Sequence, residues 1–160
     1  MVEIDGLRLT ETFAILAYLS EKIGIVPETI KGRYLVNSAS DLLRDLVQSM
    51  FPIFFSPPEA KDEAIAKFEP ILDSKLGYLE NRLKENESQE FFVGKSLSLA
   101  DILMMHIYYS FLLRADGLES TIAKLKETLD KHPFFVEYVT KMKENHFKEY
   151  FENVRITPEI

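Results

Sequence analysis

The sequence contains no cysteine. A disulfide scaffold, a zinc site with thiolate ligands and a cysteine nucleophile are therefore excluded within these 160 residues. The absence of disulfides is consistent with a reducing compartment such as the cytosol. We therefore expect a cytoplasmic protein.

The chain also lacks a long apolar run. A helix that spans a bilayer needs about 18 consecutive apolar residues, and no stretch approaches that length. The opening residues, Met1–Asp5, lack the basic start and the apolar core of a secretory signal. We expect no membrane contact.

Positive charge is scarce as well: 19 Lys and Arg stand against 26 Asp and Glu, which gives a net charge of -7. A nucleic-acid partner is disfavoured, because binding a phosphate backbone requires a face rich in Lys and Arg. The acidic residues form no run, so a solvated surface explains them most simply. Apolar residues, by contrast, make up 46% of the chain, which is enough to bury a sizeable core.

The first 24 residues differ in pattern from the rest. Apolar and charged residues alternate over Val2–Asp5 and again over Leu7–Leu9, and Asp5-Gly6 between them supplies a hairpin turn. From Phe13 to Ile23 the apolar spacing becomes helical, and Gly24 follows as a natural stop. The pattern predicts a β-hairpin that leads into a helix.

Five further helices are predicted by the spacing of apolar residues. They cover about 27–50, 59–84, 98–114, 118–130 and 133–145, and an aromatic-containing tail runs from 149 to 160. Pro52 and the Pro57-Pro58 pair predict bends or a break, and Pro70 predicts a kink or a local restart. The fold class is mainly α, a helical bundle.

The start of the helix at 98 carries the clearest local signal. Ser98 is placed to cap the helix by accepting from the N–H of Asp101, and Asp101 is placed to reach back to the N–H of Ser98. Leu97 and Ile102 flank this capping box as a hydrophobic staple, and Gly94 permits the turn before it. Taken by itself, the motif is structural and performs no chemistry.

The stretch Val93-Gly94-Lys95-Ser96-Leu97-Ser98-Leu99-Ala100-Asp101-Ile102 also resembles the signature of the glutathione S-transferase C-terminal domain. The segment from Met1 to Leu19 is similar to the last hairpin and helix of that family's thioredoxin-like domain, closest in spacing to the alpha, mu, pi and sigma group. The resemblance implies a truncated thioredoxin-like ββα fragment, residues 1–24, followed by an all-helical domain, residues 25–160.

The resemblance also implies where glutathione, as the substrate, would bind. Glu11 and Thr12 stand where the family holds the γ-glutamyl end of glutathione, and a helix N-terminus favours a ligand carboxylate. Asp45 matches the position that reaches the neighbouring subunit's glutathione in a homodimer. Read without the family, Thr10 or Thr12 is an N-cap, Glu11 a first-turn acid and Asp45 a solvated residue.

A hydrophobic substrate site, which would take a small apolar electrophile, is implied at the end of the second helix. Its residues are Met50, Phe51, Phe54 and Phe55. Phe147, Tyr150 and Phe151 are placed to close that pocket. The alternative is that this aromatic stripe belongs to the core.

The family's chemistry depends on a Tyr, Ser or Cys near the start of the thioredoxin-like domain, which favours the glutathione thiolate. By the resemblance this chain begins past that position, so no catalytic residue is assigned to it. The expected function is glutathione S-transferase, with a non-catalytic interaction or ligand-binding module as the alternative. No metal site is expected, and His106 is expected to be a hydrogen-bonded core histidine.

Overall fold

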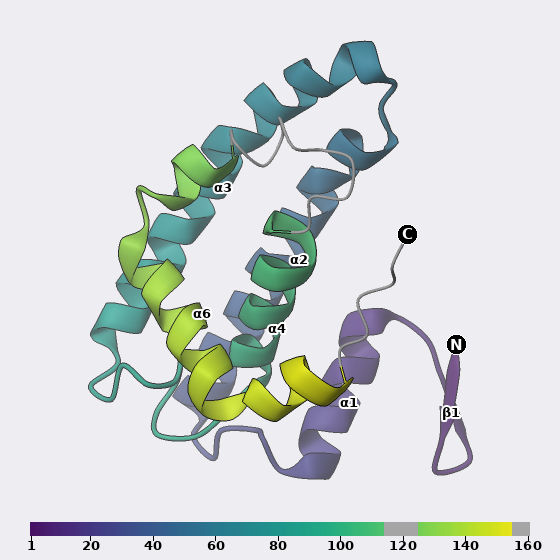
Figure 1. Ribbon diagram of the computed structural model, residues 1–160. Coiled ribbons are helices and arrows are strands. Elements are labelled where there is room, and N and C mark those ends of the chain that lie inside the picture. The colour runs from purple at the N-terminus through teal and green to yellow at the C-terminus, as the bar shows by residue number, and fades with distance from the viewer. Residues whose placement is uncertain (114–124, 155–160) are drawn as a thin grey trace.

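The computed structural model describes residues 1–113 and 125–154 (Figure 1). The predicted helix 118–130 and the end of the predicted tail therefore lie partly outside the described residues. The elements in chain order are β1 (Val2–Ile4), β2 (Leu7–Leu9), α1 (Thr12–Ile23), α2 (Ile30–Phe55), η1 (Pro58–Ala60), α3 (Lys61–Glu85), α4 (Leu99–Ile107), η2 (Tyr108–Leu112), α6 (Pro133–His146) and η3 (Tyr150–Val154).

The predicted hairpin and first helix are present. β1 and β2 pair antiparallel, with Val2 opposite Leu9, and α1 ends at Gly24, whose φ of 76° is the left-handed conformation that glycine adopts easily. The carboxylate of Asp5 accepts from the hydroxyl of Tyr18 at 2.7 Å and from Nζ of Lys22 at 2.5 Å. These two bonds fix the hairpin to α1.

The long helix α2 begins where the side chain of Pro27 packs closely on Gly32. Oγ1 of Thr29 accepts from the N–H of Gly32 at 3.0 Å, which caps the helix. A Cβ at position 32 would lie 2.7 Å from Cβ of Pro27, so only glycine fits here.

A break at Pro52 is ruled out, because α2 continues through it to Phe55. A proline inside a helix removes one N–H donor, and the buried neighbours Met50 and Ile53 keep this last turn packed on the core. The break comes instead before Pro57, and η1 then leads into α3. Helix α3 likewise runs without interruption past Pro70.

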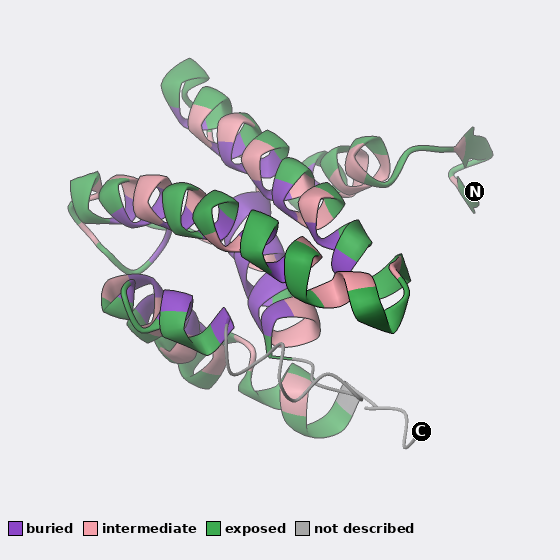
Figure 2. Ribbon diagram, turned by 90° about the horizontal axis from the view of Figure 1, so that it is seen from above, coloured by how far each residue is buried: buried purple, intermediate pink, exposed green. Residues whose placement is uncertain are grey.

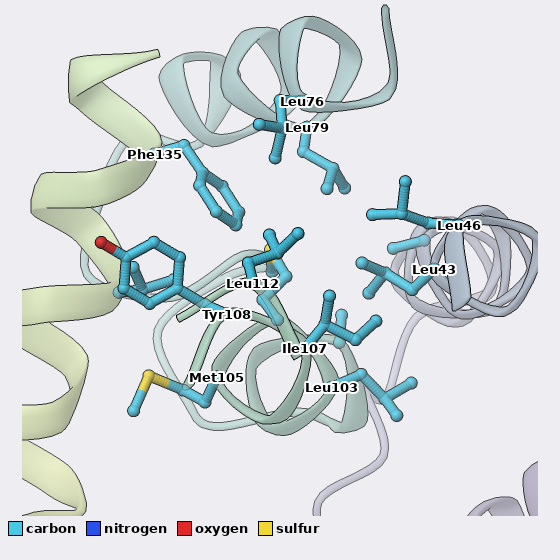
Figure 3. Packing of buried hydrophobic residues seen from close by; sticks show 14 of the residues in the cluster. Leu43, Leu46, Leu76, Leu79, Leu103, Met105, Ile107, Tyr108, Leu112 and Phe135 are labelled. Carbon is cyan, nitrogen blue, oxygen red and sulfur yellow. The ribbon is translucent and has the colours of Figure 1, made fainter. Parts of the chain in front are cut away.

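Helix α4 lies at the centre of the bundle, against α2, with α6 packed on both α3 and α4 (Figure 1). Seven of its nine residues are buried. Leu43 and Leu46 of α2, Leu76 and Leu79 of α3 and Phe135 of α6 meet around it (Figure 3). Buried residues gather on the inward faces of the helices and exposed residues on the outer faces (Figure 2).

The start of α6 is held by a buried carboxylate of α3. Oε1 of Glu80 accepts from the N–H groups of Phe134 at 2.8 Å and Phe135 at 3.1 Å. His132, the residue before α6, lies between Oδ1 of Asp73 at 3.0 Å and Oε2 of Glu80 at 3.5 Å. These contacts satisfy N–H donors that a helix start leaves without an intrahelical partner.

Candidate functional site

A cavity of about 930 Å³ lies among four segments that are far apart in the sequence. The start of α1, the middle of α2, the stretch from α4 into η2, and the turn after α6 all contribute side chains. Figure 1 shows where these elements lie in the fold. A pocket of this size suits a small organic molecule. Its apolar lining consists of Phe13, Ala14, Leu16, Val47, Phe51, Ile102, Leu103, Met105, Ile107, Phe111, Phe147, Tyr150 and Phe151.

Of the polar residues that line the cavity, four lie at the start of α1 or on α2, and the other two described ones, His106 and Ser110, lie on α4 and η2. Glu11 and Thr12 stand at the start of α1, and Arg44 and Gln48 lie one helical turn apart on α2. The cavity thus joins a charged and hydroxyl-bearing region to an apolar body. A ligand with one polar end and one apolar end matches this division.

The backbone of Glu11 is in an uncommon conformation. Its φ of 66° and ψ of 109° lie outside the regions that non-glycine residues favour, and its carbonyl still accepts from the N–H of Ile15 at 2.9 Å. No side chain described in the structure caps α1, and no acid follows in its first turn. Strained backbone of this kind concentrates at ligand-binding sites. Glu11, Thr12 and Phe13 line the cavity, so the N-terminus of α1, where an anion is favoured, lies at its wall.

Arg44 is the basic residue among the described side chains of this cavity. Its guanidinium lies 5.5 Å from the centre of the Phe13 ring and 2.7 Å from Oδ1 of Asp41. The ring contact and the ion pair hold the cation beside the start of α1.

The aromatic residues after α6 form the opposite wall. Phe147, Tyr150 and Phe151 all line the cavity, as the sequence predicted for a segment that closes the pocket. The Phe151 ring meets the Tyr109 ring of η2 edge to face, with centroids 5.0 Å apart. The end of the described chain is therefore part of the site.

Comparison with known proteins decides the family. Residues 44–154 match the model described as glutathione S-transferase, C-terminal domain. The chain belongs to the glutathione S-transferase family. The match covers the second half of α2, from Arg44 to Phe55, and every later helix that the structure describes.

Several curated relatives that the chain matches are named glutathione S-transferases. Over 109 residues the chain is 32% identical to glutathione S-transferase A2 of Bos taurus, an alignment covering 68% of this chain and 49% of the relative. It is 31% identical to glutathione S-transferase A1 of Homo sapiens, with the same coverage of 68% and 49%. The chain therefore spans about half the length of the curated relatives it matches.

Solved structures agree on the fold. A glutathione S-transferase of Ascaris lumbricoides is 25% identical and superposes with a TM-score of 0.75, covering 98% of this chain and 74% of that one. A glutathione S-transferase of Necator americanus, described as monomeric, is 23% identical with a TM-score of 0.79, again covering 98% and 74%. The hairpin and α1 are included in these superpositions, because nearly the whole chain is covered.

The family signature forms a buried hydrogen-bonded centre. Asp101 is fully buried, and its carboxylate accepts from the N–H of Ser98 at 2.7 Å, from the Ser98 hydroxyl at 2.6 Å and from the N–H of Phe92 at 2.7 Å. The hydroxyl of Tyr138 also donates to it. Burial raises the pKa of Tyr138, and the charge of Asp101 raises it further. The motif is structural, as its residues alone indicated.

Asp45 lies apart from the cavity. Its Oδ2 accepts from Nζ of Lys75 on α3 at 3.4 Å, and its side chain is otherwise exposed. The pair joins α2 to α3 on the outer face of the bundle. The structure therefore does not bring Asp45 together with Glu11 and Thr12.

The four residues of the expected hydrophobic site separate from one another. Phe51 lines the cavity, whereas Met50 is 1% exposed and belongs to the core. Phe54 lies against Phe111 with ring centroids 6.3 Å apart, and Phe55 is 82% exposed beyond the edge of Phe51. Met50 and Phe51 follow one another on α2 and point to different sides, so only Phe51 of these two can face the cavity.

The expectation for His106 is wrong. It is exposed rather than buried, lines the cavity and meets Phe111 edge to face at 5.4 Å. The sequence argument rested on its apolar neighbours Met105 and Ile107, which are buried. Near the end of α4 several residues line the cavity, and His106 is an exposed one among them.

Sequence reasoning missed several polar wall residues, among them Arg44, Gln48 and Ser110. Arg44, Gln48 and Phe51 follow the three- and four-residue spacing of one helix face, so extending the face of Phe51 backwards along α2 would have found the other two. Within the described residues no cluster of three or more His, Asp or Glu suits a metal, and no helix is long and apolar enough to cross a membrane.

Proposed function

We propose that this chain is the larger part of a glutathione S-transferase and that its cavity receives glutathione and an apolar electrophile. The single observation that carries the proposal is the meeting of Glu11 and Thr12 with an apolar cavity, on this family's fold. Residues 1–24 would then belong to the glutathione-binding domain and residues 25–160 to the helical domain.

In this proposal the γ-glutamyl end of glutathione binds at the start of α1. The Thr12 hydroxyl and the first N–H groups of α1 receive the ligand carboxylate, and the Glu11 carboxylate pairs with the ligand ammonium. The apolar wall from Phe51 to Phe151 holds the electrophile. The glutathione thiolate then attacks an electrophilic carbon, so that a carbon–sulfur bond forms and the displaced group leaves with the electron pair.

No side chain of this chain is assigned the role of activating the thiol. Its residues bind and orient: α1 binds the peptide, and the cavity excludes water from the apolar reactant. The proposal includes a homodimer, in which Asp45 would serve a partner's glutathione only after its contact with Lys75 opens. A cytoplasmic location completes the proposal.

Retention on immobilised glutathione tests the binding step. The chain is expected to be retained and to elute with free glutathione, and Thr12→Ala is expected to abolish retention. Thr10→Ala is the matched control, because Thr10 is exposed and lies outside the cavity. Failure of the unaltered chain to bind, or equal retention of both variants, would contradict the assignment.

The second candidate is a non-catalytic ligand-binding or interaction module. The observation that favours it is the cavity itself, whose apolar wall comes mostly from the helical part of the chain. A chain that binds an apolar fluorescent ligand but is not retained by glutathione would support this second function over the first.

A further inference from the structure

A lysine of α6 lies between two aromatic rings at the edge of the cavity. Nζ of Lys143 is 5.1 Å from the ring centre of Tyr109 on η2 and 5.1 Å from that of Phe151 on η3. An ammonium at this distance from a ring face is attracted to it. One cation thus contacts two rings from different elements.

The two rings also contact each other, edge to face, with centroids 5.0 Å apart. Phe151 lines the cavity, whereas Lys143 does not. The backbone bond from the N–H of Phe151 to the carbonyl of Phe147, at 3.0 Å, lies within the C-terminal turn and cannot fix that turn against η2. The contacts of Phe151 with Lys143 and Tyr109 do join the turn to the bundle.

We propose that Lys143 is a positioning residue, which holds Phe151 as a wall of the cavity and thereby sets the affinity of the cavity for flat, neutral, apolar molecules. The inference goes beyond the proposed function, because it concerns the apolar wall and requires no glutathione. Lys143 acts on the ligand through Phe151. Its positive charge therefore affects ligand affinity without any direct contact between Lys143 and the ligand.

Two substitutions separate the effect of the lysine's charge from the effect of its side-chain volume. Lys143→Met keeps a long apolar stem and removes the ammonium, so it loses the attraction to both rings. Lys143→Arg keeps a cation that also lies well over aromatic faces. Lys141→Met is the matched control, because Lys141 lies on the same helix, is exposed, and pairs with Glu137 at 2.5 Å.

Two measurements on the full chain test the proposal. The first is hydrogen–deuterium exchange of the amides at residues 148–153, which reports how firmly the turn is held. The second is the dissociation constant of N-phenyl-1-naphthylamine, an uncharged fluorescent probe. Because the probe carries no charge, a loss of affinity cannot come from losing a direct ion pair with the lysine.

Lys143→Met is expected to speed exchange at 148–153 and to raise the dissociation constant roughly threefold to tenfold, from the usual strength of two cation–ring contacts. Lys143→Arg is expected to stay within about twofold of the original on both measurements. Phe151→Leu should remove the effect of Lys143→Met, as a double-mutant cycle would show. The proposal would be overturned if Lys143→Met left the exchange or the probe affinity unchanged, or if Lys143→Arg did not restore them. It would also be overturned if the original chain did not bind the probe.

Discussion

The hydroxyl of Tyr138 on α6 donates a hydrogen bond to the carboxylate of Asp101 on α4. Because the same carboxylate accepts from the N–H of Phe92 and from Ser98, one buried side chain joins α6, the start of α4 and the loop before it. The family signature therefore acts between elements as well as at a helix start.

Tyr138→Phe should destabilise the fold by about 1.5–3 kcal/mol, the usual range for a hydrogen bond to a charged group. The ring remains and only the donor is lost, so Asp101 keeps its other partners. Urea unfolding followed by circular dichroism measures the change. Tyr34→Phe, at a residue that is 65% exposed, should have no measurable effect; equal stability of the two variants would contradict this account.

From the environment of Tyr138 we also expect the folded chain to lose stability in alkali. Its pKa in the folded chain is raised by burial and by Asp101, so the folded state holds its proton when the unfolded state releases it. This contribution is fully present below about pH 10, the ordinary pKa of tyrosine, and declines above it. Unfolding midpoints from pH 8 to 11 should therefore fall less steeply in Tyr138→Phe than in the original chain.

From the environment of Glu80 we expect a corresponding loss of folding stability in acid. Burial alone raises the pKa of Glu80, but the N–H donors at the start of α6 and the charge of Lys84 outweigh it and lower the pKa. A carboxyl with a lowered pKa stabilises the fold above its ordinary value, and that stability is lost as the pH falls through the folded pKa. The midpoint should drop more between pH 6 and 3 for the original chain than for Glu80→Gln. Glu137→Gln, at an exposed position, should follow the original curve.

Two glycines should respond oppositely to alanine. Gly32→Ala places a Cβ 2.7 Å from Cβ of Pro27 and should cost about 1–3 kcal/mol, because the chain must move apart at the start of α2. Gly77→Ala meets only Cε1 of His132 at 3.6 Å, an ordinary contact inside α3, and should stabilise by about 0.5–1 kcal/mol. Chemical denaturation of both variants checks the signs; a neutral Gly32→Ala would show that this approach relaxes freely.

A further prediction concerns the hairpin of β1 and β2. Within the described residues β1 pairs with β2 alone, and a two-stranded ribbon is marginal by itself. We expect the amides of residues 2–5 to exchange rapidly in a monomer, or to be protected by a second copy in an oligomer. Protected amides in a chain shown by sedimentation to be monomeric would contradict the expectation.

The mainly helical fold and most helix bounds could be predicted from the sequence, because apolar spacing and caps are local. Gly24 and Thr29 act within one turn of their own helix. The Pro57-Pro58 pair does mark the end of α2, but no break occurs at Pro52, because Met50 and Ile53 in the same turn are held in the core.

The site was predicted less well, because a cavity depends on facing directions and on distant segments. Glu11, Thr12 and Phe51 do line it, but Met50 next to Phe51 turns into the core. Arg44 and His106 line the cavity because of how α1, α2 and α4 are placed relative to one another. The sequence of a single segment does not encode that placement. The ion pair of Asp45 with Lys75 likewise joins two helices, α2 and α3.

The cavity walls come from both ends of the described chain and from its middle. A partly unfolded molecule that released α1 or the turn after α6 would therefore lose the cavity altogether. Any ligand that fits must then bind the native state alone, and occupancy raises the free energy of unfolding of the whole molecule by mass action, by about 2.7 kcal/mol at a hundredfold excess over the dissociation constant. Thermal shift with candidate compounds would thus report binding through global melting, even though no compound contacts most of the core.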